Sequence, residues 1–141
     1  MDRRSFIRIS MAGAATGIIA PEIVIADAMT HINDHKMAGG LYYTKESPGR
    51  WRKKAGSHSP IIEKTDRGLR VVTGHPMKPN QHWIVKHVVL DKDFRFVAEN
   101  IFNPEKDKAA ISTFELSGQT GAVYALSVCN LHDSWLSMIE I

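Results

Sequence analysis

Seven short segments rich in β-branched and aromatic residues follow one another from Pro60 to the end of this chain of 141 residues. Turn-forming residues separate them, for example Asp-Arg-Gly at 66–68 and Ser-Gly-Gln at 117–119. No window shows the apolar spacing of an amphipathic helix, and no internal repeat is visible. The chain is therefore predicted to be all-β, an immunoglobulin-like β-sandwich of about seven strands. The predicted strands cover residues 61–64, 69–73, 83–90, 94–102, 111–116, 122–128 and 135–141.

Residues 1–28 have the features of an export signal. Residues 3–7 read Arg-Arg-Ser-Phe-Ile, an apolar run follows at 9–20, and Ala-Asp-Ala at 26–28 is typical of a cleavage site. The apolar run is too short and too rich in Gly and Ala for a good membrane span, so no stable membrane insertion is expected. The arginine pair resembles a twin-arginine signal, which predicts export to the periplasm by the twin-arginine pathway. An ordinary secretory signal with two arginines is the alternative.

The remaining 113 residues are enough for one domain with a core. Residues 29–57 lack apolar periodicity and are rich in Gly, Lys, His and Ser, which predicts an irregular arm or loop before a domain at 58–141. The net charge of +3 is mild and does not suggest a nucleic-acid partner. The sequence does not decide the oligomeric state, and a homo-oligomer is one of the alternatives.

The chain has a single cysteine, Cys129, and seven histidines. One cysteine cannot form an intramolecular disulfide, so in an oxidising compartment it is buried, reactive or bound to a metal. Three of the histidines, His58, His75 and His132, lie beside turn residues, and loops at the end of a sandwich are where such a scaffold presents a site. Cys129 ends a predicted strand, so its thiol and the His132 ring can turn toward one point.

Three motifs extend this pattern: GSHSPIIE at 56–63, GHPMKPNQHWI at 74–84 and CNLHDSW at 129–135. In type and order they resemble those of the superoxide reductases, in the iron-centre domain shared by neelaredoxin and desulfoferrodoxin. The resemblance implies an immunoglobulin-like β-sandwich and one mononuclear, non-haem Fe(2+)/Fe(3+) ion with four equatorial imidazoles and an axial thiolate. The ligands at the matching positions are His58, His75, His82, His132 and Cys129.

The resemblance also implies an activity. With five protein ligands, the sixth iron position opposite the sulfur is open, and superoxide is expected to be reduced there to hydrogen peroxide. The thiolate is expected to push electron density onto the iron, as in thiolate-ligated haem. One cysteine cannot build a rubredoxin-like tetracysteine site, so the electrons must come from an external donor protein.

The motifs depart from the family pattern at three places. The family's Glu-Lys pair before the first histidine is Gly56-Ser57 here; Lys53 and Lys54 in the run RWRKK are candidates to restore the positive charge, unless that run is a solvated loop. Four residues instead of three separate Met77 from His82, which predicts a bulged loop. Asp133-Ser134 replaces a glycine-led turn, which predicts altered access beside the site.

Other histidines offer alternatives. His87 is five residues from His82, so on one strand the two face opposite sides of the sheet, and His82 is favoured because it is nearer to the His-Pro-Met turn. His31 and His35 have the i, i+4 spacing of a helical metal pair, although histidines on flexible arms are far commoner.

Two rival functions remain at this stage. Tyr124, Cys129, His132 and Met138 also resemble the ligand loop of a cupredoxin, an electron carrier with a His2Cys copper site and a weak axial Met. That interpretation leaves the His-Pro-Met and His-x-Pro motifs unexplained. The other rival is a non-catalytic iron-binding module on the same scaffold.

Overall fold

The computed structural model describes the chain from residue 21 to residue 141, with side chains from residue 28. The predicted twin-arginine motif lies outside the described residues and stays a prediction. Among the described residues, none of the helices has the length and apolar character needed to cross a membrane.

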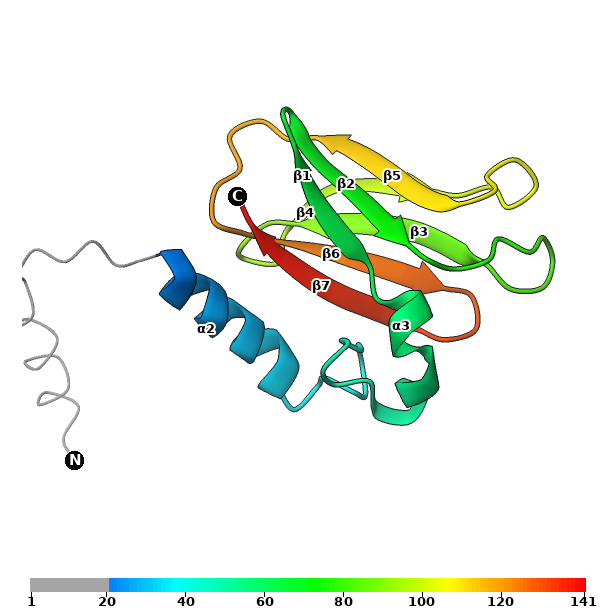
Figure 1. Cartoon of the computed structure of the whole chain (residues 1–141), viewed down its shortest axis with the longest axis horizontal. Helices are drawn as coiled ribbons and strands as arrows, with labels where there is room; N and C mark the ends of the chain where they lie inside the picture. Colours follow the sequence, from blue (N-terminus) through cyan, green and yellow to red (C-terminus); the bar gives the residue numbers. More distant parts are fainter. Residues whose placement is uncertain (1–20) are drawn as a thin grey trace, which may run out of the picture.

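Two antiparallel sheets face each other (Figure 1), and they confirm the predicted all-β sandwich of seven strands. The three-stranded sheet has the order β1-β2-β5, and the four-stranded sheet has the order β4-β3-β6-β7. The bounds are β1 Ile61–Thr65, β2 Gly68–Thr73, β3 Ile84–Leu90, β4 Phe96–Ile101, β5 Ala110–Glu115, β6 Ala122–Cys129 and β7 Ser134–Glu140. The predicted ranges are right to within two residues. The largest shift at a strand start is at β4, because Phe94 adopts a φ of 60° in the preceding turn and cannot extend the strand.

The main core forms where the inward-facing residues of the two sheets meet. Strand β2 alternates half-buried and buried positions, which places Leu69 and Val71 against the other sheet. A second apolar cluster fills one end of the sandwich and contains Met77, Ile84, Phe102, Ala110 and Cys129. The only cysteine is thus packed into the core at the end where β6 finishes.

The N-terminal region holds more helix than the sequence predicts. Helix α2, Pro21–Asp34, lies beside β7, and Ile32 is buried there with Tyr124 and Leu136. A 3-10 helix η1, Gly49–Lys54, leads into the short helix α3, Ala55–His58. In the described part of α2, Ile32 is the one fully buried residue, so the helix leaves no apolar stripe that a sequence pattern can reveal.

The segment between α2 and η1 is tied to the edge of the sandwich. The Tyr43 amide donates to the carbonyl of Ser134 at 2.9 Å, and the Leu136 amide donates to the carbonyl of Tyr43 at 2.8 Å. The Tyr43 and Trp135 side chains are both buried, with ring centroids 5.6 Å apart. This short parallel bridge anchors the arm next to the start of β7.

A buried polar group joins the two sheets around His87, which is fully buried. Its Nε2 lies 2.9 Å from Thr73 Oγ1 on β2, and its Nδ1 lies 2.9 Å from Ser112 Oγ on β5. Thr73 Oγ1 also donates to Ser127 Oγ on β6 at 2.8 Å. Burial lowers the pKa of His87 from 6.5 to about 4, so this imidazole is neutral at pH 7 and both its nitrogens have hydroxyl partners.

We predict that His87 contributes to acid unfolding. Its pKa in the folded protein lies below the ordinary value, so the unfolded chain takes up the proton first as the pH falls. Stability is therefore lost between pH 6.5 and about 4. In His87→Gln the unfolding free energy should fall less steeply with decreasing pH in this range. The difference in slope from the wild type should be up to about 1.4 kcal/mol per pH unit. Denaturant titrations across this range test the prediction, with His31→Gln, an exposed histidine, as the control. Equal slopes for the wild type and His87→Gln would contradict it.

Candidate metal centre

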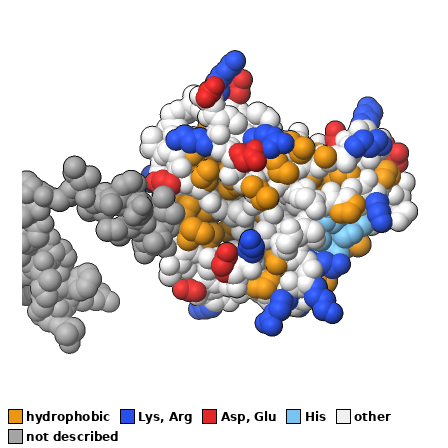
Figure 2. All heavy atoms as spheres, viewed as in Figure 1, with side chains coloured by type: hydrophobic (Ala, Val, Ile, Leu, Met, Phe, Trp, Pro, Cys, Tyr) orange, Lys and Arg blue, Asp and Glu red, His pale blue; other side chains and the backbone are white. Residues whose placement is uncertain are grey.

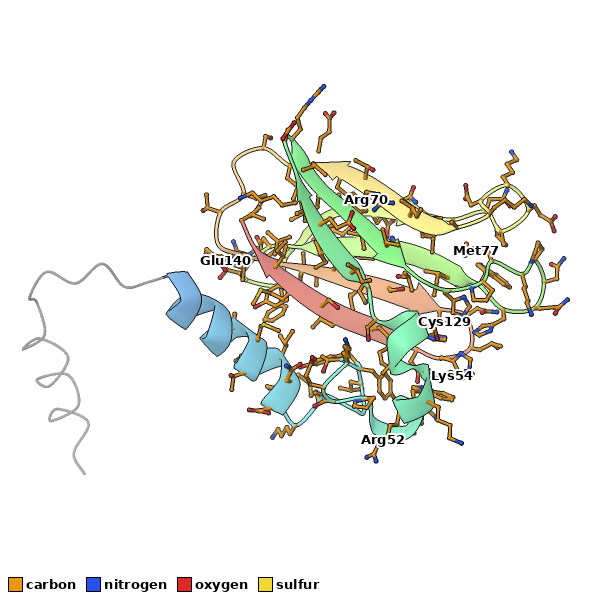
Figure 3. The ribbon with its side chains drawn as sticks, viewed as in Figure 1. Arg52, Lys54, Arg70, Met77, Cys129 and Glu140 are labelled. Carbon is orange, nitrogen blue, oxygen red and sulfur yellow. The ribbon has the colours of Figure 1, made fainter. Side chains whose placement is uncertain are left out.

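Three segments meet at the end of the sandwich where Cys129 is buried. His58 ends α3, His75 and His82 lie in the connection between β2 and β3, and Cys129 and His132 lie at the turn between β6 and β7. In Figure 3, Cys129 and Met77 are labelled at this end of the molecule, with Lys54 beside them. Figure 2 shows histidine side chains at the surface of the same end.

The two buried histidines of this cluster, His58 and His75, are oriented through their Nδ1 atoms. His58 Nδ1 lies 3.1 Å from the carbonyl of Lys54 and 2.8 Å from Ser57 Oγ. His75 Nδ1 lies 2.5 Å from the carbonyl of Pro76. A carbonyl accepts a proton from Nδ1, so Nε2 keeps its lone pair. Both Nε2 lone pairs are therefore available for a metal, and the carbonyls fix the ring orientations.

His82 is placed by a tight turn. The amides of Gln81 and His82 both donate to the carbonyl of Lys78, and the Lys78 amide donates back to the carbonyl of His82 at 2.9 Å. Asn80 adopts a φ of 59° within this turn, a conformation that asparagine tolerates. The additional residue between Met77 and His82 is taken up in this compact turn, and His82 still reaches the other histidines.

Asn130 joins the two loops that carry most of the cluster. Its side-chain oxygen accepts from the Trp83 amide at 3.0 Å, and its side-chain nitrogen donates to the carbonyl of Gln81 at 3.1 Å. Beside it, β3 is bulged between Ile84 and Lys86 relative to β6, next to the pairing of Ile84 with Cys129. Asn130 was not among the predicted site residues, although its position inside the Cys-Asn-x-His motif was the available signal.

The four imidazoles form a ring around a common centre. His75 Nε2 lies 2.9 Å from His82 Nε2, which lies 2.9 Å from His132 Nδ1; His132 Nδ1 lies 3.1 Å from His58 Nε2. Neighbouring ring centroids are 4.1–4.9 Å apart, and the His58 and His82 centroids across the ring are 5.6 Å apart. Three successive nitrogen–nitrogen separations are thus about 3 Å, and the four rings surround one centre.

The thiol lies close to the same centre. Cys129 Sγ is 3.2 Å from His82 Nε2 and 3.6 Å from His132 Nδ1. The donor atoms of His58, His75, His82 and Cys129 all lie within 4.8 Å of one another. His132 belongs to the same group because its Nδ1 is in contact with three of these four donor atoms. The structure thus brings together all five predicted ligands.

Hydrogen bonding alone does not explain this arrangement. His82 Nε2 has three close polar neighbours, whereas a neutral ring nitrogen carries either one proton or one lone pair. A metal cation at the centre accepts all the lone pairs at once. Nitrogens at the corners of a square, each about 2.1 Å from a metal as in zinc–imidazole sites, lie about 3.0 Å apart. The observed separations fit a bound metal.

The protonation of the cluster suits metal binding. Burial lowers the pKa of His58 to about 3 and that of His75 to about 4, and it also lowers the pKa values of His82 and His132. All four imidazoles are therefore neutral at pH 7, the form that binds metals. Burial raises the pKa of the Cys129 thiol, and a bound cation reverses that effect by stabilising the thiolate.

The two candidate lysines, Lys53 and Lys54, differ in their effect on the cluster. Burial is the main cause of the pKa shifts of His75, His82, His132 and Cys129, and the positive charge of Lys54 acts on each of them as a smaller, lowering effect. Figure 3 labels Lys54 at this end of the molecule. Lys53 is exposed, and no described charge effect on the cluster comes from it. Lys and Arg side chains gather beside the surface histidines in Figure 2.

The remaining candidate histidines lie elsewhere. His87 is in the core, bonded to hydroxyls, and is not part of the cluster. His31 and His35 have ring centroids 5.7 Å apart on and just after α2. Among the described residues, no further His, Cys, Asp or Glu joins them to complete a metal group.

A family model described as Desulfoferrodoxin matches residues 50–138, more than half of the chain. This chain belongs to the desulfoferrodoxin family. The match confirms the resemblance inferred from the three motifs. No curated protein matches the sequence.

Solved structures agree with this assignment. The superoxide reductase (neelaredoxin) from Ignicoccus hospitalis is 27% identical, with a TM-score of 0.56, over 73% of this chain and 95% of that one. The superoxide reductase (1Fe-SOR) from Giardia intestinalis is 18% identical, with a TM-score of 0.52, over 60% of this chain and 98% of that one, and it supports the fold alone. The single mononuclear iron of the desulfoferrodoxin family fits the histidine–cysteine cluster.

We predict that His82, and not His87, is needed for iron. His82→Ala should lower the iron content of anaerobically purified protein well below one per chain, because a donor atom is removed. His87→Gln should leave the iron content unchanged, because its ring bonds only to hydroxyls. Metal analysis with circular dichroism, to show that both variants fold, checks this. Full iron in His82→Ala would remove His82 from the ligand set.

Proposed function

We propose that this protein is a superoxide reductase, which reduces superoxide to hydrogen peroxide at one iron held by His58, His75, His82, His132 and Cys129. The observation that carries the proposal is the group of four imidazoles, with successive nitrogens about 3 Å apart and a single thiol beside them. Membership of the desulfoferrodoxin family and the likeness to a neelaredoxin named as a superoxide reductase support the same reaction.

The residues around the site have different roles in this reaction. When bound, the iron supplies the single electron that superoxide takes up in becoming peroxide. Cys129 lies on the core side of the cluster among Met77, Ile84 and Phe102, so an anion approaches from the opposite, solvent side. His82 and His132 are half-buried and border that approach, while the carbonyls of Lys54 and Pro76 keep two imidazoles in position.

Lys54 takes the place of the missing family lysine. It is four residues before His58, and the turn of α3 brings its backbone to the His58 ring and its charge toward the cluster. Ser57, at the family's lysine position, instead contacts Nδ1 of His58. A positive charge at this place attracts the superoxide anion and stabilises the developing peroxide.

The returning electron comes from outside the chain. Cys129 is the only cysteine, so no tetracysteine iron site can form within the sequence. We infer a separate one-electron donor protein. The most direct contact of this donor with the iron site is at the edge of the cluster formed by the half-buried His82 and His132.

A copper carrier fits the geometry less well. The weak axial ligand of that class would be Met138, yet Met138 packs with Ile32, Tyr124 and Leu136, in a different cluster from Cys129. Four clustered imidazoles also exceed the two that a His2Cys copper site uses. The rival of a non-catalytic iron module has the same ligands and differs only in its reaction with superoxide.

The reaction with superoxide tests the function. Protein purified without air should hold close to one iron per chain. After a pulse of radiolytic superoxide it should form peroxide without dioxygen, since superoxide is reduced rather than dismuted. In the same experiment Lys54→Met should react more slowly, by about tenfold, and with a weaker dependence on ionic strength.

The control is Lys53→Met, which removes the same charge from the neighbouring exposed residue and should react like the wild type. Iron that does not consume superoxide would indicate the non-catalytic module. Stoichiometric copper would indicate the carrier. Equal rates for the two lysine variants would leave the reaction in place but remove Lys54 from it.

We also propose that the protein works in the periplasm after twin-arginine export, on the strength of residues 3–7 and 26–28. Replacing Arg3 and Arg4 by lysine should trap the precursor in the cytoplasm, because that pathway reads the arginine pair. Fractionation of the native host with an antibody to the protein measures it. Unchanged periplasmic protein in the double variant would point to the general secretory route and would leave the iron site untouched.

A further inference from the structure

Asp133 directly follows His132 and replaces the glycine of the family pattern. Its φ is 61°, in the left-handed region that glycine adopts without strain and that aspartate tolerates. The proposed reaction gives this residue no task. An aspartate kept in a glycine conformation beside a metal ligand calls for an explanation in terms of its side chain.

The Asp133 carboxylate binds the start of η1. Its Oδ2 accepts from Trp51 Nε1 at 2.7 Å and from Arg50 Nη2 at 2.7 Å. The Arg50 guanidinium also lies over the Trp51 ring, 4.6 Å from its centroid. Residues more than 80 positions apart in the sequence are thus joined by two charge-assisted hydrogen bonds.

These bonds place Trp51 against a predicted metal ligand. The Trp51 and His132 rings meet edge to face, with centroids 4.7 Å apart and planes at 84°. Trp51 is half-buried, so the indole covers part of the His132 ring that solvent would otherwise reach. Asp133 therefore acts on the edge of the cluster through Trp51.

Apart from these bonds, the contacts of this segment lie mainly at its two ends. None of the residues of η1 is buried, and its N-terminus has no side-chain cap. Trp51 itself departs from helical geometry, with φ of −98° and ψ of 24°. At its start the Gly49 backbone packs closely against the backbone of Gly39, and at its far end the Lys54 carbonyl meets His58 Nδ1. A short, exposed helix of this kind is not stable by itself.

We propose that Asp133 is a positioning residue that holds η1 across the edge of the metal centre, so that Trp51 shields His132 and slows loss of the metal. The proposal rests on the proposed function only in requiring that the cluster binds iron, and it does not depend on the reaction with superoxide. Arg50 and Trp51 are the partners through which Asp133 works.

Limited proteolysis of the iron-loaded protein tests the attachment. Trypsin can cut after Arg52, Lys53 and Lys54, and also after Arg67 in the exposed turn between β1 and β2, which serves as an internal control. Asp133→Gly removes both hydrogen bonds to η1, so cleavage within η1 should become at least about tenfold faster. Cleavage after Arg67 should not change. Glycine is the sharpest choice because it keeps the left-handed turn free of strain.

Iron release to a chelator tests the shielding. Asp133→Gly and Trp51→Ala should both lose iron several-fold faster than the wild type. Asp133→Asn should lie closer to the wild type, because its amide oxygen still accepts from Trp51. Asp93→Asn, an exposed aspartate paired only with the adjacent Lys92, is the matched control. The thiolate absorption band should be the same in all variants at the start, which shows that the ligand set is intact.

The outcomes separate the two proposals. Unchanged cleavage of η1 in Asp133→Gly would overturn the positioning role, whatever the protein does with superoxide. Faster cleavage with unchanged iron release would show that η1 is held by Asp133 but does not shield His132, and it would also overturn the proposal. A protein that holds iron, responds as expected to both variants and yet fails to reduce superoxide would contradict the proposed function alone.

Discussion

Lone pairs from four imidazoles and a thiol converge on one point at the end of the sandwich, and most of the surrounding structure serves to hold them there. Such a group of like dipoles is unfavourable unless a cation occupies the centre, because each nitrogen offers a single donor or acceptor function. The short distances around His82 show that these hydrogen-bond demands cannot all be met within the cluster. Metal binding and the final packing of this end are therefore coupled energetically.

The sandwich supplies the rigidity that this convergence requires. Cys129 is fixed by the apolar cluster beneath it, and Asn130 joins its turn to the turn that carries His82. Below them, Thr73 and Ser127 bond to each other across the sheets, two residues before His75 and Cys129 respectively. Strands β2 and β6, which lead to His75 and Cys129, are thus hydrogen-bonded to each other just before they leave the core.

The strands and the clustering of the histidines with Cys129 were the most predictable features, for different physical reasons. A strand that buries one face shows a two-residue period, as β2 and β5 do, and this period is visible in the sequence. The candidate ligands were predicted from the resemblance to a family whose motifs fix residue types and order. Helix α2 was missed because Ile32 alone provides its fully buried contact in the described part.

The features of the site that could not be predicted depend on contacts between segments distant in the sequence. To decide which of Lys53 and Lys54 faces the cluster, one must know where each side chain points at the junction of η1 and α3. The spacing of residues in the sequence does not give that direction. The altered turn at Asp133 was visible as a departure, but its partners Arg50 and Trp51 lie more than 80 residues earlier in the sequence. Asn80 absorbs an extra residue through a left-handed conformation, which preserves the site despite the changed spacing.

The solitary thiol has a chemical consequence for the lifetime of the protein. Peroxide oxidises a cysteine first to sulfenic acid, which many proteins rescue by condensation with a second, resolving cysteine. Cys129 has no such neighbour in the sequence, so an oxidation event in the chain proceeds to irreversible sulfur acids unless an outside thiol intervenes. Its burial beneath the imidazoles then slows this oxidation, since a peroxide formed on the solvent side in the proposed reaction must penetrate the core to reach the sulfur from behind. A cavity-forming change at Ile84 or Phe102 would shorten the working life of the centre without touching a ligand.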